Sequence, residues 1–257
     1  MPDRRPQPMR VWLADLDRLE AALEAVEATA GLLACTERKW MSPAPAGARR
    51  RRRLARIALR LVLVRQGAEA ARGVELAVDA HGKPRLATDG LAFNASHSGG
   101  LALIAVASHG PIGVDLETER RVQLGPERRA LIVAAGSALC ATGCGPGGSI
   151  TVLAAECTSD TATFLAAWTR LEAFAKARGT GIGTLLTDLG ITASGARVST
   201  PYDVGARAHA LSDATQLAVA SLALLSGTYG AVAAPREHLR EVSRVEHLDP
   251  ADCRLET

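Results

Sequence analysis

The sequence predicts a mixed α+β fold in which strand–helix–strand material occurs in each half of the chain. Residues 101–107 have the length and the apolar content of a buried strand. Residues 164–178 instead carry apolar side chains at a helical spacing. A chain of 257 residues can form one large domain or two small ones, with ample material for a core.

The first half is expected to begin with a short strand at residues 11–15, followed by an alanine-rich helix over residues 16–35. After a loop rich in proline, a second helix is expected over residues 49–65. Its apolar stripe consists of Leu54, Ile57, Leu61 and Val64. A separate face carries Arg49, Arg53, Arg56 and Arg60, while Arg50, Arg51 and Arg52 crowd the first turns.

This arginine-rich helix has three interpretations. Guanidinium groups near free backbone N–H groups can bind phosphate. A basic face can also simply be solvated. Nucleic-acid binding is a further possibility, but the helix lacks the interleaved aromatic residues that would stack on bases.

A strand is expected at residues 74–78, followed by a turn in which Lys83 lies between Gly82 and Pro84. Residues 94–100 are expected to be a polar turn, because they are rich in hydroxyls and loop-forming residues. Strands should follow at residues 101–107 and 112–117. On the latter, Asp115 and Glu117 share one face about 7 Å apart, either as Mg²⁺ ligands or as solvated acids at a strand end.

The second half continues with a basic patch, Arg120, Arg121, Arg128 and Arg129, and then with a small-residue stretch, 134–160, that is expected to be a loop. A helix over residues 164–178 ends at a run of glycines, and Phe164, Trp168, Glu172 and Lys176 form one stripe along it. Strands are expected at residues 185–198 and 216–225, the latter central in its sheet. The tail over residues 235–257 is expected to be peripheral.

Composition excludes few classes of protein. The formal net charge of +3 is too mild to indicate nucleic-acid binding by itself. Only three of the 30 basic residues are lysines, namely Lys39, Lys83 and Lys176. The five cysteines match no zinc-ligand spacing and are expected to be unpaired thiols. With neither a signal peptide nor a membrane span in evidence, we expect a cytoplasmic protein.

Four motifs stand in an order and spacing that resembles the 4′-phosphopantetheinyl transferase superfamily, in its single-chain Sfp-type branch. They are Gly-Lys-Pro at 82–84, Phe-Asn-Ala-Ser-His-Ser at 93–98, Gly-Val-Asp-Leu-Glu at 113–117 and Trp-Thr-Arg-Leu-Glu-Ala-Phe-Ala-Lys at 168–176. The resemblance covers residues 49–183. Each motif alone is weak, but four in order are specific.

The resemblance implies a Mg²⁺-dependent enzyme, with Mn²⁺ as a possible substitute. Such enzymes transfer the phosphopantetheine arm of coenzyme A to a serine of an acyl, peptidyl or polyketide carrier protein and release adenosine 3′,5′-bisphosphate. Their fold is a pseudo-dimer of two similar α/β halves with coenzyme A between them. Here the halves would be residues 1–108 and 109–234, in a monomer with neither nucleic-acid nor membrane partners.

The resemblance also implies roles for particular residues. Asp115, Glu117 and Glu172 would hold the metal, and Lys83, Ser96 and His97 would contact the coenzyme A phosphates. Arg51 is the best match to the arginine that binds the 3′-phosphate, with Arg50 or Arg52 as alternatives of register. Glu172 would accept the serine proton, and Lys176 would stabilise the departing bisphosphate. His97 is expected to donate to phosphate rather than to act as a base.

Two features depart from the family pattern. Leu171 replaces the lysine that usually precedes the helix glutamate, and it falls with Ala167 and Phe174 on a face expected to be buried. Residues 134–160 lack the expected aromatic and acidic residues, which leaves the choice of carrier open. The alternative function is a non-catalytic relative that binds coenzyme A or a carrier protein. A metal-dependent phosphohydrolase is a further alternative.

Overall fold

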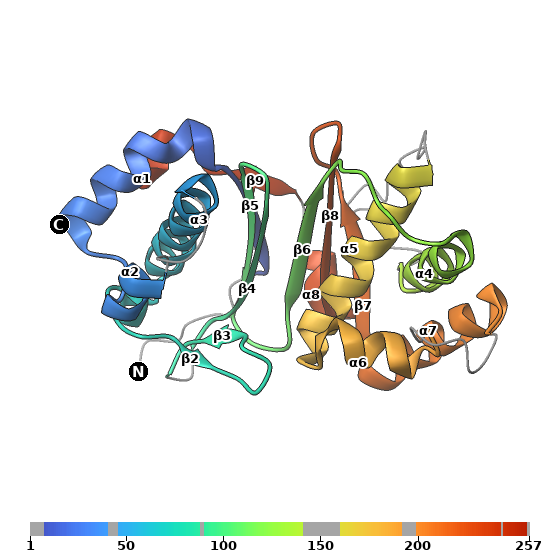
Figure 1. Cartoon of the computed structure of the whole chain (residues 1–257). Helices are drawn as coiled ribbons and strands as arrows, with labels where there is room; N and C mark the ends of the chain where they lie inside the picture. The colour runs from blue at the N-terminus through green and yellow to red at the C-terminus, as the bar shows by residue number, and fades with distance from the viewer. Residues whose placement is uncertain are drawn as a thin grey trace.

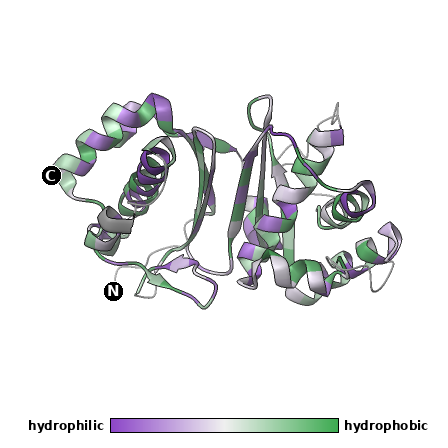
Figure 2. Cartoon of the chain, viewed as in Figure 1, coloured by the Kyte–Doolittle hydropathy of each residue, from purple (hydrophilic) through white to green (hydrophobic). Residues whose placement is uncertain are grey.

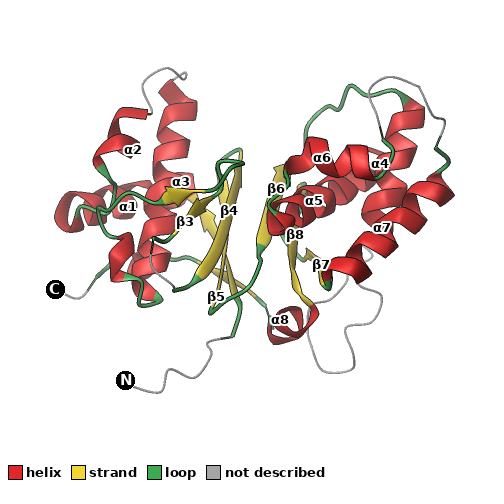
Figure 3. Cartoon of the chain, turned by 90° about the horizontal axis from the view of Figure 1, so that it is seen from below, coloured by secondary structure: helices red, strands yellow, loops and turns green. Residues whose placement is uncertain are grey.

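The computed structural model describes residues 8–40, 46–87, 90–140, 160–191, 199–242 and 244–255, and it confirms a mixed α+β fold (Figure 1). The main layers are helices, a sheet, a second sheet and further helices (Figures 1 and 3). None of the helices in these ranges is long and apolar enough to cross a membrane.

The first sheet has four strands in the order β4-β5-β1-β9. These are β1 (Arg10–Asp15), β4 (Ala92–Ser98), β5 (Leu101–Ala107) and β9 (Val245–His247). Helices α1 (Leu16–Ala30), α2 (Cys35–Trp40) and α3 (Ala46–Arg65) lie over its outer face. Alternate residues of β1 explain the layering, because Trp12 and Ala14 enter the helix-side core while Val11 and Leu13 face the other sheet.

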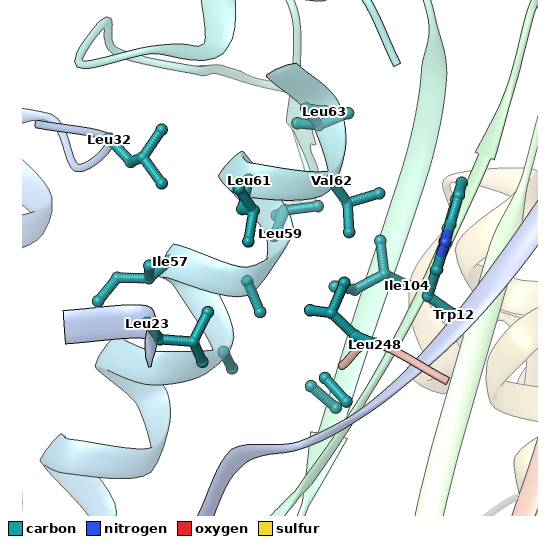
Figure 4. Close-up of a cluster of buried hydrophobic side chains, with 14 of the residues drawn as sticks. Trp12, Leu23, Leu32, Ile57, Leu59, Leu61, Val62, Leu63, Ile104 and Leu248 are labelled. Carbon is teal, nitrogen blue, oxygen red and sulfur yellow. The ribbon is translucent and has the colours of Figure 1, made fainter. Parts of the chain in front are cut away.

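The helix-side core of this half joins α1, α3 and the sheet, and Figure 4 shows part of it. All four stripe residues of the second predicted helix are buried there, which confirms the period of that helix. Leu248 and Cys253 also belong to this core, and β9 pairs in parallel with β1. The last residues that the structure describes are therefore part of a sheet and a core, contrary to the peripheral tail expected.

The second sheet has three antiparallel strands in the order β6-β8-β7. These are β6 (Gly113–Thr118), β7 (Leu217–Leu222) and β8 (Thr228–Pro235). Its outer face is covered by helices α4 (Pro126–Ala138), α5 (Asp160–Arg178), α6 (Gly181–Asp188) and α7 (Pro201–Thr215). The two sheets pack through a shared apolar layer that includes Leu103, Val114, Ala220 and Val232.

Short elements complete the described chain. A two-stranded ribbon, β2 (Ala77–Val78) with β3 (Pro84–Arg85), precedes β4, and helix α8 (Arg236–Glu241) follows β8. The 3₁₀ turns η1 (Glu69–Ala71) and η2 (Pro250–Cys253) lie after α3 and β9. The expected strand at residues 74–78 is thus reduced to its last two residues. The described cysteines, Cys35, Cys140 and Cys253, are free.

Three other expectations were wrong. Residues 94–98 belong to β4 rather than to a turn, and the chain reverses only at Gly99–Gly100, where Gly99 has a φ of 58°. Polar residues suit this strand because it is the edge of its sheet. Residues 185–188 are helical in α6 rather than a strand. The strand was inferred from a short apolar run, and such a run does not distinguish a strand from a buried helix. β7 is an edge strand rather than a central one.

The expected loop at residues 134–160 is helical at its start, because α4 extends to Ala138. Residues 141–159 and 192–198 lie outside the described residues. The expected helix over 164–178 is confirmed, although it begins earlier, at Asp160.

Candidate functional site

The candidate site lies along the seam between β4 and β6, the facing edges of the two sheets. Asn94, Ser96 and Ser98 alternate along β4 and so share one face, and all three make side-chain contacts with β6. The Val114 N–H donates to Asn94 Oδ1 at 2.8 Å, and the Thr118 N–H donates to Ser98 Oγ at 3.1 Å. Side chains therefore take the place of a backbone ladder at this seam.

Helix α5 comes unusually close to β6 at the start of the strand. A Cβ on Gly113 would lie 2.1 Å from the Ala173 carbonyl oxygen and 2.5 Å from the Ala177 nitrogen. Glycine is therefore required for this approach. The approach brings Lys176 of α5 within reach of the seam.

Lys176 is the side chain through which α5 reaches the seam. Its Nζ lies 2.6 Å from Asp115 Oδ1, 3.1 Å from the Val114 carbonyl oxygen and 3.2 Å from Ser96 Oγ. Asp115 is also the acceptor of a 2.9 Å hydrogen bond from Ser96 Oγ. Predicted residues from three separate motifs thus meet at one point.

The two other predicted metal ligands flank this point. Glu117 forms an ion pair with Arg120, whose Nη2 lies 2.9 Å from Glu117 Oε1. The Glu172 side chain forms neither a hydrogen bond nor an ion pair with any other residue that the structure describes. Burial raises the pKa of Glu172, and the negative charges of Asp115 and Glu117 raise it further against the ammonium of Lys176.

Burial also raises the pKa of Asp115, although the Lys176 ammonium opposes this shift. The three carboxylates therefore influence one another electrostatically. Within the described ranges, however, the structure contains no group of three or more His, Cys, Asp or Glu side chains close enough to hold a metal ion. The predicted ligand set is near the seam but is not assembled around one point.

Lys83 lies beside the same site from the first half. Its Nζ donates to the Ile112 carbonyl at 2.6 Å and to the Lys176 carbonyl at 2.9 Å. Burial lowers its pKa to about 8. The lysine thus joins the β2–β3 ribbon to the start of β6 and to the end of α5.

Lys83 also lines an open groove of about 1180 Å³. Phe93, Ile112 and Arg178 contribute to its walls, so the groove reaches the seam from the end at which β4 and β6 begin. Its lining is mixed, with apolar walls and basic residues at several points.

His97 lies on the other face of β4 from Ser96. Burial lowers its pKa, and the positive charges of Arg52, Lys176 and Arg56 lower it further. The imidazole is therefore neutral at pH 7 and has one N–H to donate. This environment suits the phosphate contact expected of His97.

The arginines in the first turns of α3 pair with acids of α1. Arg51, the residue expected to bind the 3′-phosphate, forms an ion pair with Asp17 at 3.2 Å, and Arg50 contacts both Asp17 and Glu20. Arg52 makes no ion pair with a described residue, and it is the arginine with the largest charge effect on His97. Figure 2 shows these turns as the hydrophilic end of α3.

Farther along α3 the basic face is also neutralised. Arg53 pairs with Glu24, and both Arg56 and Arg60 pair with Glu37. Arg60 is fully buried rather than on an open face. Most of the predicted basic face therefore forms salt bridges to α1 and α2.

Sequence reasoning missed two members of the site. Asn94 could have been found from the alternation of polar residues if 92–98 had been interpreted as a strand. Arg120 was noted only as part of a basic patch, and no spacing rule links it to Glu117 across a strand end. The Leu171 expectation is confirmed, since this side chain is fully buried in the core beneath α5.

No protein-family model matches the chain, and no curated protein matches its sequence.

Proposed function

We propose that this chain is a 4′-phosphopantetheinyl transferase of the single-chain type, which moves the phosphopantetheine arm of coenzyme A to a serine of a carrier protein. The observation that carries the proposal is the meeting of Ser96, Asp115 and Lys176 within 3.2 Å of one another. These residues come from three motifs far apart in the sequence. Lys83 of the fourth motif bonds to the backbone of Lys176.

The architecture supports the same proposal at a coarser level. Each half has a sheet whose outer face carries helices, and the two sheets face each other (Figure 1). This arrangement is compatible with a pseudo-dimer within one chain. An open groove of about 1180 Å³ lies at the end where β4 and β6 begin, and Lys83 lines it, whereas Ser96, Asp115 and Lys176 do not.

The oxygen atoms at the seam are of the kinds that bind a hard divalent cation, although the three carboxylates are not gathered around one point in the described part of the chain. The point now held by the Lys176 ammonium is surrounded by carboxylate, hydroxyl and carbonyl oxygens, which are the ligand types that Mg²⁺ prefers. Asp115, Glu117 and Glu172 would hold the ion. When bound, Mg²⁺ or Mn²⁺ would neutralise charge that develops on the pyrophosphate.

The chain's own residues supply positioning and proton transfer. The serine hydroxyl of the carrier forms a bond to the β-phosphorus of coenzyme A, and the bond from that phosphorus to the bridging oxygen breaks. Glu172 accepts the serine proton, and its raised pKa makes it a better base than an exposed carboxylate. Lys176, Lys83 and His97 stabilise the phosphates, and the bridging oxygen leaves with adenosine 3′,5′-bisphosphate.

Arg52 is the arginine of α3 that best fits the 3′-phosphate in this proposal. It has no carboxylate partner among the described residues and acts on His97. The four arginines after β6 contribute less to carrier docking than their number indicates. Arg120 is paired with Glu117, and Arg129 donates to the Val122 carbonyl and lies over Phe164. This leaves Arg121, which is exposed, and Arg128, which is partly buried, for an acidic carrier helix.

The test is a mass spectrum of apo carrier proteins after incubation with this protein, coenzyme A and Mg²⁺. Wild-type protein should add one phosphopantetheine, whereas Asp115→Asn should lose at least about 100-fold in rate. Asp213→Asn is the matched control, because it removes a carboxylate that is paired far from the seam with Arg236. It should load the carrier at the wild-type rate.

The panel should include fatty-acid, polyketide and peptidyl carriers, because the sequence leaves the pathway open. Coenzyme A binding without transfer to any of them would support the non-catalytic alternative. Release of bisphosphate from coenzyme A without a carrier would support a phosphohydrolase.

A further inference from the structure

The ammonium of Lys176 occupies a place that a metal ion would also favour. Its three oxygen neighbours come from both halves of the chain, with Ser96 from the first and Val114 and Asp115 from the second. The Asp115 side chain is only 9% exposed, so this ion pair is poorly screened by water. We call these three oxygen atoms the oxygen cage, and the Lys176 ammonium already fills it.

A second internal cation acts on the neighbouring carboxylate. Arg120 makes a two-point contact with Glu117, with Nη2 to Oε1 at 2.9 Å and Nε to Oε2 at 3.2 Å. Two of the three carboxylates proposed to hold the metal therefore already have cationic partners. Among the described residues, no group of three or more His, Cys, Asp or Glu side chains is placed to hold a metal ion.

We propose that Lys176 is an exchangeable internal cation: it holds Asp115 while the metal is absent, and the incoming divalent ion displaces it toward the substrate phosphates. The proposal deepens the transferase function and rests on it. It assigns Lys176 two successive partners, Asp115 and then phosphate.

Two physical arguments support displacement rather than coexistence. A divalent ion and an ammonium that share one carboxylate oxygen would be only a few ångströms apart, and their repulsion in a partly buried site is strong. The lysine side chain has a flexible four-carbon stem, so it can leave Asp115 without any backbone movement. Competition of this kind lowers the apparent affinity of the site for metal by the fraction of the population in which Asp115 is free.

The first experiment observes Lys176 directly in the wild-type protein. Only three lysines occur in the sequence, so labelling lysine with ¹³C at the ε position gives three signals for NMR. Addition of Mg²⁺ without coenzyme A should move the Lys176 signal strongly and leave that of Lys39 unchanged. Lys83 is the internal control, because it lies beside Lys176 but donates to carbonyl oxygens. The proposed exchange would be contradicted if the signals of Lys83 and Lys176 shifted equally, or if the Lys176 signal did not shift at saturating Mg²⁺.

The second experiment measures metal affinity by the EPR signal of free Mn²⁺. Lys176→Met should bind Mn²⁺ about tenfold more tightly than wild type, because the competing cation is gone. Lys83→Met removes an equal charge nearby without freeing Asp115, so its gain should be smaller. If Lys176→Met binds Mn²⁺ no more tightly than Lys83→Met does, the proposal fails.

The outcomes separate this proposal from the transferase function. If the carrier is loaded while the Lys176 signal does not move at saturating Mg²⁺, the exchange of Lys176 is contradicted and the transferase function is retained. Metal-dependent movement of Lys176 without loading of any carrier would retain the exchange and remove the transferase. Neither experiment uses activity as its readout.

Discussion

Helices α3 and α5 each carry charged residues against a sheet, but they treat those charges differently. On α3, Arg53, Arg56 and Arg60 are matched by acids from α1 and α2. On α5, Glu172 has no partner among the described residues, and Lys176 reaches across to Asp115 on β6. We call Arg53, Arg56 and Arg60 of α3 the closed set, because each is paired with an acid, and Glu172 and Lys176 of α5 the open set, because Glu172 is unpaired among the described residues.

This difference indicates where a ligand can act. The paired arginines Arg53, Arg56 and Arg60 join α3 to α1 and α2 within the first half, and they contribute to stability and specificity of packing. Charges that remain unmatched at a seam between two sheets can be completed by a cation or by phosphate. The arginine-rich helix, the most conspicuous feature of the sequence, is therefore mostly structural.

The largest expected effect lies in the closed set on α3. Glu37→Ala should destabilise the protein by about 3–5 kcal/mol, because it leaves the fully buried Arg60 without its carboxylate. Glu24→Ala, which breaks the more exposed pair with Arg53, should cost about 0.5–1 kcal/mol. Urea unfolding measures both. Similar costs for the two variants would mean that α3 is not held by its buried pair.

The next effect concerns the residue that departs from the family pattern. Leu171→Lys should destabilise the protein by roughly 3 kcal/mol, because the side chain is fully buried beneath α5. Ala48→Lys on the exposed first turn of α3 should change stability by less than about 0.5 kcal/mol. Faster carrier loading by a stable Leu171→Lys protein would contradict the buried position.

The approach of α5 to β6 can be tested with a pair of glycines. Gly113→Ala should cost about 2 kcal/mol, because its Cβ would collide with the backbone of Ala173 and Ala177. Gly47→Ala, near the start of α3, has open space around the new Cβ and should stabilise by roughly 0.5 kcal/mol. Thermal unfolding measures both changes. Loss of carrier loading is expected only for Gly113→Ala, because only that change moves Lys176 away from Asp115.

The smallest expected effect is the pH dependence of carrier loading, which should depend on Glu172 of the open set and on Lys83 beside it. Below the raised pKa of Glu172 the carboxylate is protonated and cannot accept the serine proton, so the rate should rise with pH through that pKa. Above about pH 8 Lys83 loses its ammonium charge, so the KM for coenzyme A should rise a few-fold. An arginine side chain, unlike a lysine, keeps its charge throughout this range. A Lys83→Arg variant should therefore lose the alkaline effect, and an unchanged profile would contradict the role of Lys83.

Local patterns in the sequence predicted most of the main elements. The short strand β1, the stripe of α3 and the period of α5 were predicted from nearby residues alone, and the structure confirms them. The opposite faces of Asp115 and Val114 on β6 follow from the alternation of side chains along a strand. The errors occurred where a segment was polar but paired, as in β4, or apolar but short, as in α6.

The sequence by itself determined which residues are candidates for the site, because motif order and the scarcity of lysine singled out Lys83, Ser96, Asp115, Glu172 and Lys176. Only the tertiary structure decided which charges meet. Glu37 neutralises Arg60, Asp17 holds Arg51, and Lys176 fills the oxygen cage at Asp115. Such pairs join residues far apart in the chain, and their strength depends on burial and distance, which no local pattern specifies.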